Sequence, residues 1–212
     1  MQIIGGIQML IIGICGASGS GKSTLAKTLA QSLNKPCVYL KQDSYYKDHS
    51  DMTFEQRVDI NYDEPEAFEH DVLYSDLLAL KSGKSITAKN YDYTHHCRCD
   101  SNEVIEPADV VLLEGIHVFY DPAVRDIMDF KIYIQVDPDV CLLRRVKRDI
   151  RDRGRSVESV YNQYLKTVKP MYEKHIRNYV EYADLIVAHG GKNARIVDIL
   201  AHYINSGKIK DN

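Results

Sequence analysis

The sequence predicts an α/β protein in which a mainly parallel, doubly wound sheet carries helices on both faces. Short, continuously apolar segments alternate along the chain with longer segments whose apolar residues recur at helical spacing, and this alternation is typical of βαβ units. The apolar segments also lack polar alternation, as expected for strands that are covered on both faces. In such folds the ligand crevice lies at the carboxyl ends of the strands.

The strands and helices are expected in alternating order. The predicted strands span residues 9–15, 37–40, 110–113, 131–136 and 184–188. The predicted helices span residues 22–33, 65–81, 138–151, 156–181 and 193–204. The second of these helices begins at Pro65 and is followed by Gly83, residue types that commonly mark the start and the end of a helix.

Residues 86–105 fit this order less well, because two β-prone runs flank a polar stretch that is rich in tyrosine and histidine. We interpret them as a β-hairpin lobe over the active site. No internal repeat or low-complexity linker interrupts the chain. We therefore expect a single domain over residues 1–212, with the hairpin lobe and an arginine-rich lid at about residues 148–156 as insertions.

Composition and charge restrict the class of protein. Hydrophobic residues make up 44% and charged residues 27% of the chain, which is ordinary usage for a soluble globular protein. The net charge of -3 provides no overall attraction to nucleic acid or to an anionic membrane, so we expect neither as a partner. The five cysteines are odd in number and scattered, which favours reduced thiols and a cytoplasmic location over a disulfide framework.

The apolar stretch before the first glycine-rich motif resembles a signal peptide only superficially. Residues 1–15 have no basic region at their start and run directly into that motif, so cleavage there would destroy it. We expect a short extension followed by a strand. No other apolar run approaches the length of about 20 residues that a membrane-spanning helix needs.

The most specific motif is a glycine-rich loop between a predicted strand and a predicted helix. It consists of Gly16, Ala17, Ser18, Gly19, Ser20, Gly21, Lys22, Ser23 and Thr24. The spacing matches the complete Walker A pattern, and strand, loop and helix are the context that confirms it. The loop predicts a P-loop NTPase fold in which backbone N–H groups hold phosphates, Lys22 reaches the β and γ phosphates, and Ser23 coordinates Mg²⁺. A chance glycine turn before a helix would not reproduce every fixed position.

Two carboxylates follow predicted strands. Glu114 ends the apolar run at residues 110–113, where a P-loop protein holds Mg²⁺ or its water shell; the alternative is an ordinary glutamate at a strand end. Asp43 follows the second strand, where it could accept a proton from an attacking hydroxyl or lie near the metal. A helix-capping role for Asp43 is an equally common use of aspartate, and the pattern alone leaves both open.

A basic segment follows the predicted helix at residues 138–151. Its basic residues are Arg144, Arg145, Lys147, Arg148, Arg151, Arg153 and Arg155. A solvated helix face is the usual explanation of such a run. Because Gly154 interrupts it, we favour a mobile lid whose arginines bind phosphate oxygens and stabilise charge during transfer.

The polar stretch His95-His96-Cys97-Arg98-Cys99 contains the residue types that bind zinc. Adjacent ligands without a second cluster at finger spacing make a poor closed zinc site. We favour a hairpin that contacts the substrate.

Taken together, these segments resemble the uridine kinase (uridine-cytidine kinase) family over residues 9–200. The resemblance is carried by Gly16 to Thr24, Gln42-Asp43-Ser44-Tyr45-Tyr46, Asn61-Tyr62-Asp63-Glu64-Pro65, Tyr91-Asp92-Tyr93-Thr94-His95-His96-Cys97-Arg98, Leu113-Glu114-Gly115-Ile116, Arg144-Arg145-Val146-Lys147-Arg148-Asp149-Ile150, Arg153-Gly154-Arg155, Gln163-Tyr164, Lys169-Pro170, Tyr182-Ala183-Asp184 and Gly190-Gly191-Lys192-Asn193. Two positions depart from the family pattern: Asn90 stands where proline is usual, and His189 where arginine is usual.

The resemblance implies roles for particular residues. Asp43 is similar to the family's catalytic carboxylate, which takes the proton from the ribose 5'-hydroxyl, and Asp63 to the aspartate that binds the 2' and 3' hydroxyls. Tyr91 and His96 match the positions that recognise the pyrimidine. Arg145, Arg155 and Gln163 match further substrate-side positions, and Arg148 and Arg153 match lid residues near the ATP phosphates.

The implied activity is phosphorylation of uridine or cytidine at the 5'-hydroxyl, which gives UMP or CMP in pyrimidine salvage. The phosphate donor would be ATP, or alternatively GTP, with Mg²⁺ as cofactor. The protein would form a homo-oligomer, which in this family is commonly a tetramer. A sister P-loop kinase acting on another small alcohol, such as phosphoribulokinase or pantothenate kinase, is the closer alternative. A nucleotide-dependent switch is the more distant one, since the chain lacks an Asn-Lys-x-Asp guanine motif.

Overall fold

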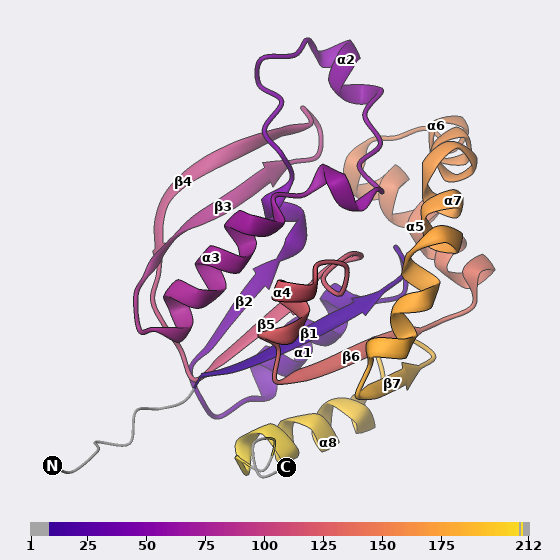
Figure 1. The fold of residues 1–212 in the computed structure, drawn as a ribbon. Helices are drawn as coiled ribbons and strands as arrows, with labels where there is room; N and C mark the ends of the chain where they lie inside the picture. Colours follow the sequence, from indigo (N-terminus) through magenta and orange to yellow (C-terminus); the bar gives the residue numbers. More distant parts are fainter. Residues whose placement is uncertain (1–8, 208, 210–212) are drawn as a thin grey trace, which may run out of the picture.

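The computed structural model describes residues 9–207 and 209 and has a five-stranded, fully parallel sheet at its centre (Figure 1). In spatial order the strands are β2 (Cys37–Lys41), β5 (Val110–Glu114), β1 (Leu10–Gly16), β6 (Phe130–Gln135) and β7 (Leu185–Ala188). The predicted strands are therefore confirmed, with their ends displaced by at most one residue. The expected extension at residues 1–8 lies outside the described residues.

The central strands β1 and β5 are buried on both faces, which explains why they are continuously apolar. In β1, Ile12 and Ile14 pack into the cluster that contains α1 (Lys22–Ser32) and α8 (Ala194–Asn205), whereas Ile11 belongs to the cluster on the opposite face. This alternation follows from the two-residue period of a strand. The doubly wound α/β prediction is confirmed.

The second face is covered by α3 (His70–Lys81), by α4 (Pro122–Asp126) and by a 3-10 helix at Ile176–Tyr182. The long helix α5 (Pro138–Arg153) leaves the carboxyl end of β6 and ends at Gly154, whose φ of 62° is left-handed. A glycine suits this position because it has no Cβ to clash in that conformation. Helices α6 (Val157–Gln163) and α7 (Lys169–Lys174) then run back along the sheet edge (Figure 1).

Two predicted helices are interrupted. The segment 65–81 is a 3-10 turn at Pro65–Ala67 followed by α3, because Phe68 between them is extended and forms a bridge with Tyr46. The segment 156–181 is divided into α6, a π-helical stretch at Tyr164–Val168, α7 and the 3-10 helix after it. The short helices α2 (Phe54–Val58) and α4, and the 3-10 turn at Gln42–Tyr45, were not among the predicted elements.

The hairpin prediction is confirmed. Strands β3 (Ile86–Asp92) and β4 (Cys97–Ile105) form a separate antiparallel sheet, and their turn rises toward the loop that carries α2 (Figure 1). Asn90 pairs with Cys99 within the ladder. Across residues 9–207 and 209, no helix is both long and apolar enough to cross a lipid bilayer.

Candidate functional site

The glycine-rich loop joins β1 to α1, as its sequence predicts. Gly21 has a φ of 104°, and a Cβ at this position would lie 2.7 Å from the backbone nitrogen of Gly191, so the loop requires glycine here. The Nζ of Lys22 donates to the carbonyl oxygen of Ala17 at 2.9 Å. The lysine is thereby held across the loop, and burial lowers its pKa, an effect opposed by the nearby charge of Glu114.

Ser23 and Glu114 meet at the mouth of the loop. The Ser23 hydroxyl donates to Oε1 of Glu114 at 2.7 Å, and the Tyr39 hydroxyl donates to the same oxygen at 2.9 Å. Burial and the Glu114 charge raise the pKa of Tyr39, so its phenol keeps its proton. Glu114 is held as a hydrogen-bond acceptor beside a hydroxyl, and both groups are hard oxygen ligands of the kind that Mg²⁺ prefers.

A single cleft of about 1170 Å³ extends from the glycine-rich loop to the hairpin. The predicted site residues that line it are Ser18, Gly19, Gly21, Lys22, Ser23, Thr24, Asp43, Asp63, Tyr91, His96, Glu114, Arg145, Arg148, Arg153, Arg155 and Gln163. Gly16, Ala17 and Ser20 belong to the loop but not to this lining, and Ser20 is fully buried beneath it. His189, which has a φ of 66°, lies at the cleft wall.

Asp43 lies in the cleft at the end of β2 and contacts the hairpin. Its Oδ2 accepts a hydrogen bond of 2.7 Å from the Tyr93 hydroxyl. The Arg153 guanidinium lies 4.1 Å from the centre of the Tyr93 ring, within the range of a cation–π contact. These contacts join a strand end, the hairpin and the arginine-rich segment around one carboxylate.

Asp63 is fixed from several directions. Its side chain is almost buried, and Oδ2 accepts a hydrogen bond of 2.7 Å from the Thr167 hydroxyl. Its backbone N–H donates to Oδ1 of Asn61 at 3.1 Å. The carboxylate therefore has one defined orientation at the cleft wall.

Aromatic rings form the hairpin end of the cleft. The His96 ring stacks on Tyr62 with a centroid distance of 5.2 Å and an interplanar angle of 18°, and Tyr91 packs against Tyr46 at 4.8 Å. Burial, followed by the charges of Arg155 and other arginines, lowers the pKa of His96. The ring is consequently uncharged at neutral pH and can donate or accept a hydrogen bond.

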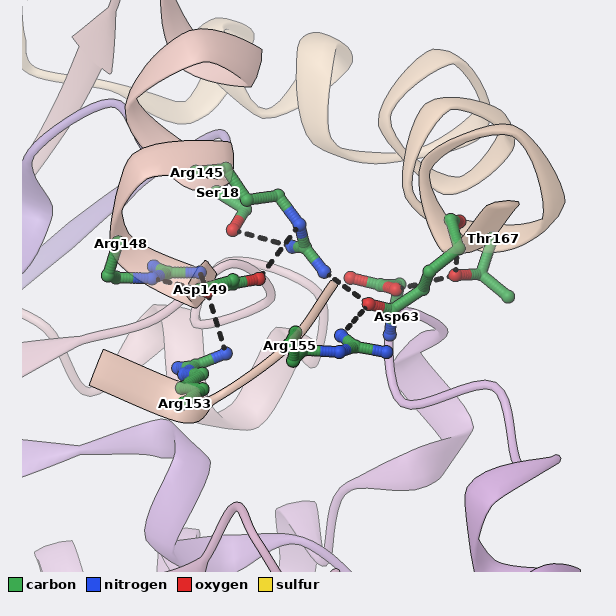
Figure 2. Close-up of polar contacts among 9 residues, drawn as sticks. Ser18, Asp63, Arg145, Arg148, Asp149, Arg153, Arg155 and Thr167 are labelled. Atoms are coloured by element: carbon green, nitrogen blue, oxygen red, sulfur yellow. Dashed lines mark hydrogen bonds and ion pairs between the residues drawn. The ribbon is translucent and has the colours of Figure 1, made fainter. Parts of the chain in front are cut away.

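Three arginines of the basic segment, Arg145, Arg148 and Arg153, converge on Asp149, as Figure 2 shows. This carboxylate is fully buried; Arg148 contacts its Oδ1 at 2.8 Å, Arg153 contacts the same atom at 3.5 Å, and Arg145 contacts Oδ2 at 3.5 Å. Burial alone would raise the pKa of Asp149, but the hydrogen bond and charge of Arg148, with the charges of Arg145 and Arg153, hold it below its ordinary value. Four charged groups are thus organised on one face of α5.

The same cluster reaches both ends of the cleft. Arg145 donates to the Ser18 hydroxyl in the glycine-rich loop at 2.9 Å (Figure 2). It also donates to Oε1 of Gln163 at 2.7 Å. Arg155 donates to the same Gln163 oxygen. Arginine side chains therefore connect the phosphate loop with the neighbourhood of Asp63.

The described residues offer few side chains that could bind a metal ion together. Within residues 9–207 and 209, no three His, Cys, Asp or Glu side chains are grouped as a metal cage. A Mg²⁺ site that also uses phosphate oxygens needs only one or two carboxylates, so this finding is compatible with Ser23, Glu114 and Asp43 as ligands. It gives no support to zinc binding at the hairpin, and all five cysteines are free.

Three contacts at this site involve residues for which the sequence suggested no role. Asp149 lies within the basic run, Thr167 follows Gln163 by one helical turn, and Tyr39 lies inside β2. Spacing from a recognised site residue is the signal that could have pointed to Thr167. Asp149 stands out from the other charged residues of the basic run only because it is fully buried, and this burial cannot be read from the sequence.

Comparison with known proteins agrees with this geometry. The model of the phosphoribulokinase / uridine kinase family matches residues 11–195. A uridine kinase of Ligilactobacillus salivarius (strain UCC118) is 47% identical over 192 residues, covering 90% of each chain. A uridine kinase of Staphylococcus haemolyticus (strain JCSC1435) is 45% identical over 197 residues, covering 92% of this chain and 95% of that one.

Solved structures share the fold. Phosphoribulokinase from Rhodobacter spheroides aligns with a TM-score of 0.62 at 17% identity, covering 86% of this chain and 71% of that one. A protein described as a possible uridine kinase from Bacillus stearothermophilus aligns with a TM-score of 0.60 at 16% identity, covering 87% and 91%. The fold is thus that of the P-loop kinases. Because the family model matches most of the chain and relatives at 45–47% identity extend over nine tenths of it, the chain belongs to the phosphoribulokinase / uridine kinase family.

Proposed function

We propose that this protein transfers the γ-phosphoryl group of ATP to the 5'-hydroxyl of uridine or cytidine and so produces UMP or CMP for pyrimidine salvage. The observation that carries the proposal is the single cleft in which a Walker A loop faces Asp43, Asp63 and an aromatic hairpin. The uridine kinases that resemble this chain over most of its length support the same acceptor.

On the acceptor side, the residues of this chain would bind and orient the nucleoside. Asp63, held by Thr167, accepts hydrogen bonds from the ribose 2' and 3' hydroxyls. His96 and Tyr91 contact the pyrimidine at the aromatic end of the cleft. Asp43 accepts the proton of the 5'-hydroxyl; the Tyr93 bond is to Oδ2, which leaves Oδ1 for the substrate. Such positioning by preorganised groups supplies much of the rate in phosphoryl transfer.

On the donor side, the glycine-rich loop and Lys22 would hold the ATP phosphates, and Arg148 and Arg153 would stabilise the charge that develops during transfer. Ser23 and Glu114, with Asp43 opposite, are the residues that would hold Mg²⁺. When bound, Mg²⁺ neutralises phosphate charge. GTP as an alternative donor uses the same phosphate contacts.

The direct test is a panel of acceptor alcohols with MgATP and purified protein, with ADP release as the general readout and chromatography as the product readout. We expect turnover with uridine and cytidine, and background rates with ribulose 5-phosphate, pantothenate and deoxyribonucleosides. Turnover confined to ribulose 5-phosphate or pantothenate would overturn the proposal in favour of a sister kinase. We also propose a homo-tetramer, which sedimentation velocity would test: a monomeric species at micromolar concentration would contradict it.

A further inference from the structure

A buried histidine outside the cleft lining contacts two of the segments that carry acceptor-side carboxylates. His117 follows β5 by three residues, and its side chain is fully buried. Its backbone N–H donates to Oε1 of Gln42 at 2.8 Å, and Gln42 is the residue before Asp43. Its ring Nε2 lies 2.7 Å from the carbonyl oxygen of Asp63. One residue thus joins the chain segments of Asp43 and Asp63, which are distant in the sequence.

The partners of the ring determine its tautomer. The Asp63 carbonyl oxygen can only accept a hydrogen bond, so Nε2 must carry a proton and donate. The second ring nitrogen, Nδ1, lies 2.8 Å from the hydroxyl of Tyr179 in the 3-10 helix at Ile176–Tyr182. Burial raises the pKa of Tyr179, which keeps the phenol protonated. The Tyr179 hydroxyl therefore donates to Nδ1, and the imidazole is neutral with its proton on Nε2.

The surroundings of His117 keep it neutral. Burial lowers its pKa to about 3, the Asp63 hydrogen bond opposes this effect, and the charges of His175 and His70 reinforce it. Glu66, on the 3-10 turn at Pro65–Ala67, acts in the opposite direction but more weakly. A neutral imidazole with both nitrogens hydrogen-bonded is a rigid connector, because any ring rotation would break two buried hydrogen bonds.

We infer that His117 is a positioning residue for the acceptor nucleoside. It orients the nucleoside indirectly, by fixing the backbone of Asp63 from the side opposite the cleft. The inference rests on the proposed function, since it assigns Asp63 to the ribose. Thr167 fixes the Asp63 carboxylate and His117 fixes the Asp63 carbonyl, so together they define both ends of the residue. His117 does not line the cleft and touches no substrate itself.

A matched pair of substitutions separates this role from general packing. In His117→Gln, the side-chain amide nitrogen lies about as far from the backbone as the Nε2 of histidine, so it can still donate to the carbonyl oxygen of Asp63. In His117→Asn, the amide nitrogen reaches only the position of Nδ1, so it cannot donate to the carbonyl oxygen of Asp63. We expect His117→Asn to raise the KM for uridine about tenfold or more, as the loss of a buried hydrogen bond does, while His117→Gln raises it less than about threefold. The KM for ATP should change less than about twofold in both.

Phe119→Leu serves as the control for stability, because Phe119 is fully buried two residues away and its ring packs near Gly13 on β1. It should lower the unfolding midpoint without moving the uridine KM. An equal uridine KM shift in His117→Gln and His117→Asn, or an unchanged KM in a folded His117→Asn protein, would overturn the inference. A wild-type protein that fails to phosphorylate uridine would instead overturn the proposed function.

A spectroscopic measurement remains decisive if the variants do not fold. Long-range ¹H–¹⁵N correlation on the wild-type protein with labelled histidine, assigned with the help of the Tyr179→Phe spectrum, reports which nitrogen carries the proton. We expect His117 as the neutral Nε2–H tautomer throughout pH 6–8. Protonation on Nδ1, or titration of the ring in this interval, would contradict the connection to Asp63.

Discussion

Replacing Asp149 by asparagine removes one negative charge from the centre of the arginine cluster while keeping the shape of the side chain. Asp149 is fully buried, and Arg145, Arg148 and Arg153 all contact its carboxylate. The amide oxygen of asparagine can still accept one hydrogen bond from Arg148. Three guanidinium groups would, however, lose their shared counter-charge.

The size of the effect follows from burial and from access to water. Breaking a buried ion pair by removing one partner destabilises a protein by about 3–5 kcal/mol. We expect about 3 kcal/mol here, because Arg148 and Arg153 line the cleft and can be hydrated there. For a chain of this length that loss lowers the melting temperature by roughly 6–12 °C.

The pH dependence has a defined sign. The pKa of Asp149 in the folded protein is below its ordinary value of 3.8. Its contribution to stability is therefore complete above the unfolded pKa and is lost as pH falls through the folded pKa. The difference in unfolding free energy between wild type and Asp149→Asn should be largest near neutral pH and should shrink below about pH 4.

Urea unfolding followed by circular dichroism, repeated between pH 3 and pH 8, measures this difference. Asp152→Asn is the matched control, because Asp152 lies on the same helix but pairs with the exposed Arg151 at the surface. It should leave stability unchanged. If Asp149→Asn were as stable as wild type at pH 7, or if the difference grew as the pH fell, the assignment of Asp149 as the charge that organises the arginines would be refuted.

Three further substitutions test the cleft. Lys22→Met should lower kcat/KM by about 100-fold or more without unfolding the protein, since it removes a charge aimed at the phosphates; activity close to wild type would exclude that role. Thr167→Val should raise the uridine KM about tenfold with the ATP KM unchanged, because one hydrogen bond to Asp63 is lost; a change in the ATP KM alone would contradict this. Tyr93→Phe should lower kcat severalfold, because the Asp43 carboxylate loses the hydrogen bond that orients it, and an unchanged kcat would show that the bond is dispensable.

The parts of the fold that could be predicted are those whose burial produces a regular pattern of apolar residues in the sequence. The central strands β1 and β5 are continuously apolar because both faces are covered, and α1 and α8 carry apolar residues at helical spacing. The short helices α2 and α4 show only terminal signals, a Thr53–Gln56 capping box and an Asp121 N-cap. Five residues are too few for a helical period to emerge.

Of the interruptions in the two predicted helices, one has a tertiary cause. Phe68 is extended because it pairs with Tyr46, a residue from another part of the chain. His175, with a φ of -122°, separates α7 from the helix that carries Tyr179. The Phe68–Tyr46 bridge cannot be derived from the local sequence, because it depends on how distant parts of the chain pack together.

The site was predictable to the extent that its chemistry is local. The glycine-rich loop, Glu114 and Asp43 follow from strand ends and spacing, and the structure brings them to one cleft. The supporting contacts are not local: Thr167 is 104 residues from Asp63, and His117 is 54 residues from it. Thr167 and His117 can be identified as partners of Asp63 only from their burial and their distances to it in the structure.

The measurement that tests the central claim most directly is UMP formation from uridine and MgATP by wild type and by Asp43→Asn, combined with calorimetric binding of both substrates. Asparagine keeps an oxygen for the Tyr93 hydrogen bond but cannot take the hydroxyl proton. We expect UMP from the wild type and a loss of about 100-fold or more in kcat in the variant, with both dissociation constants retained within about threefold. Absence of UMP with the wild type, or wild-type kcat in Asp43→Asn, would contradict the account.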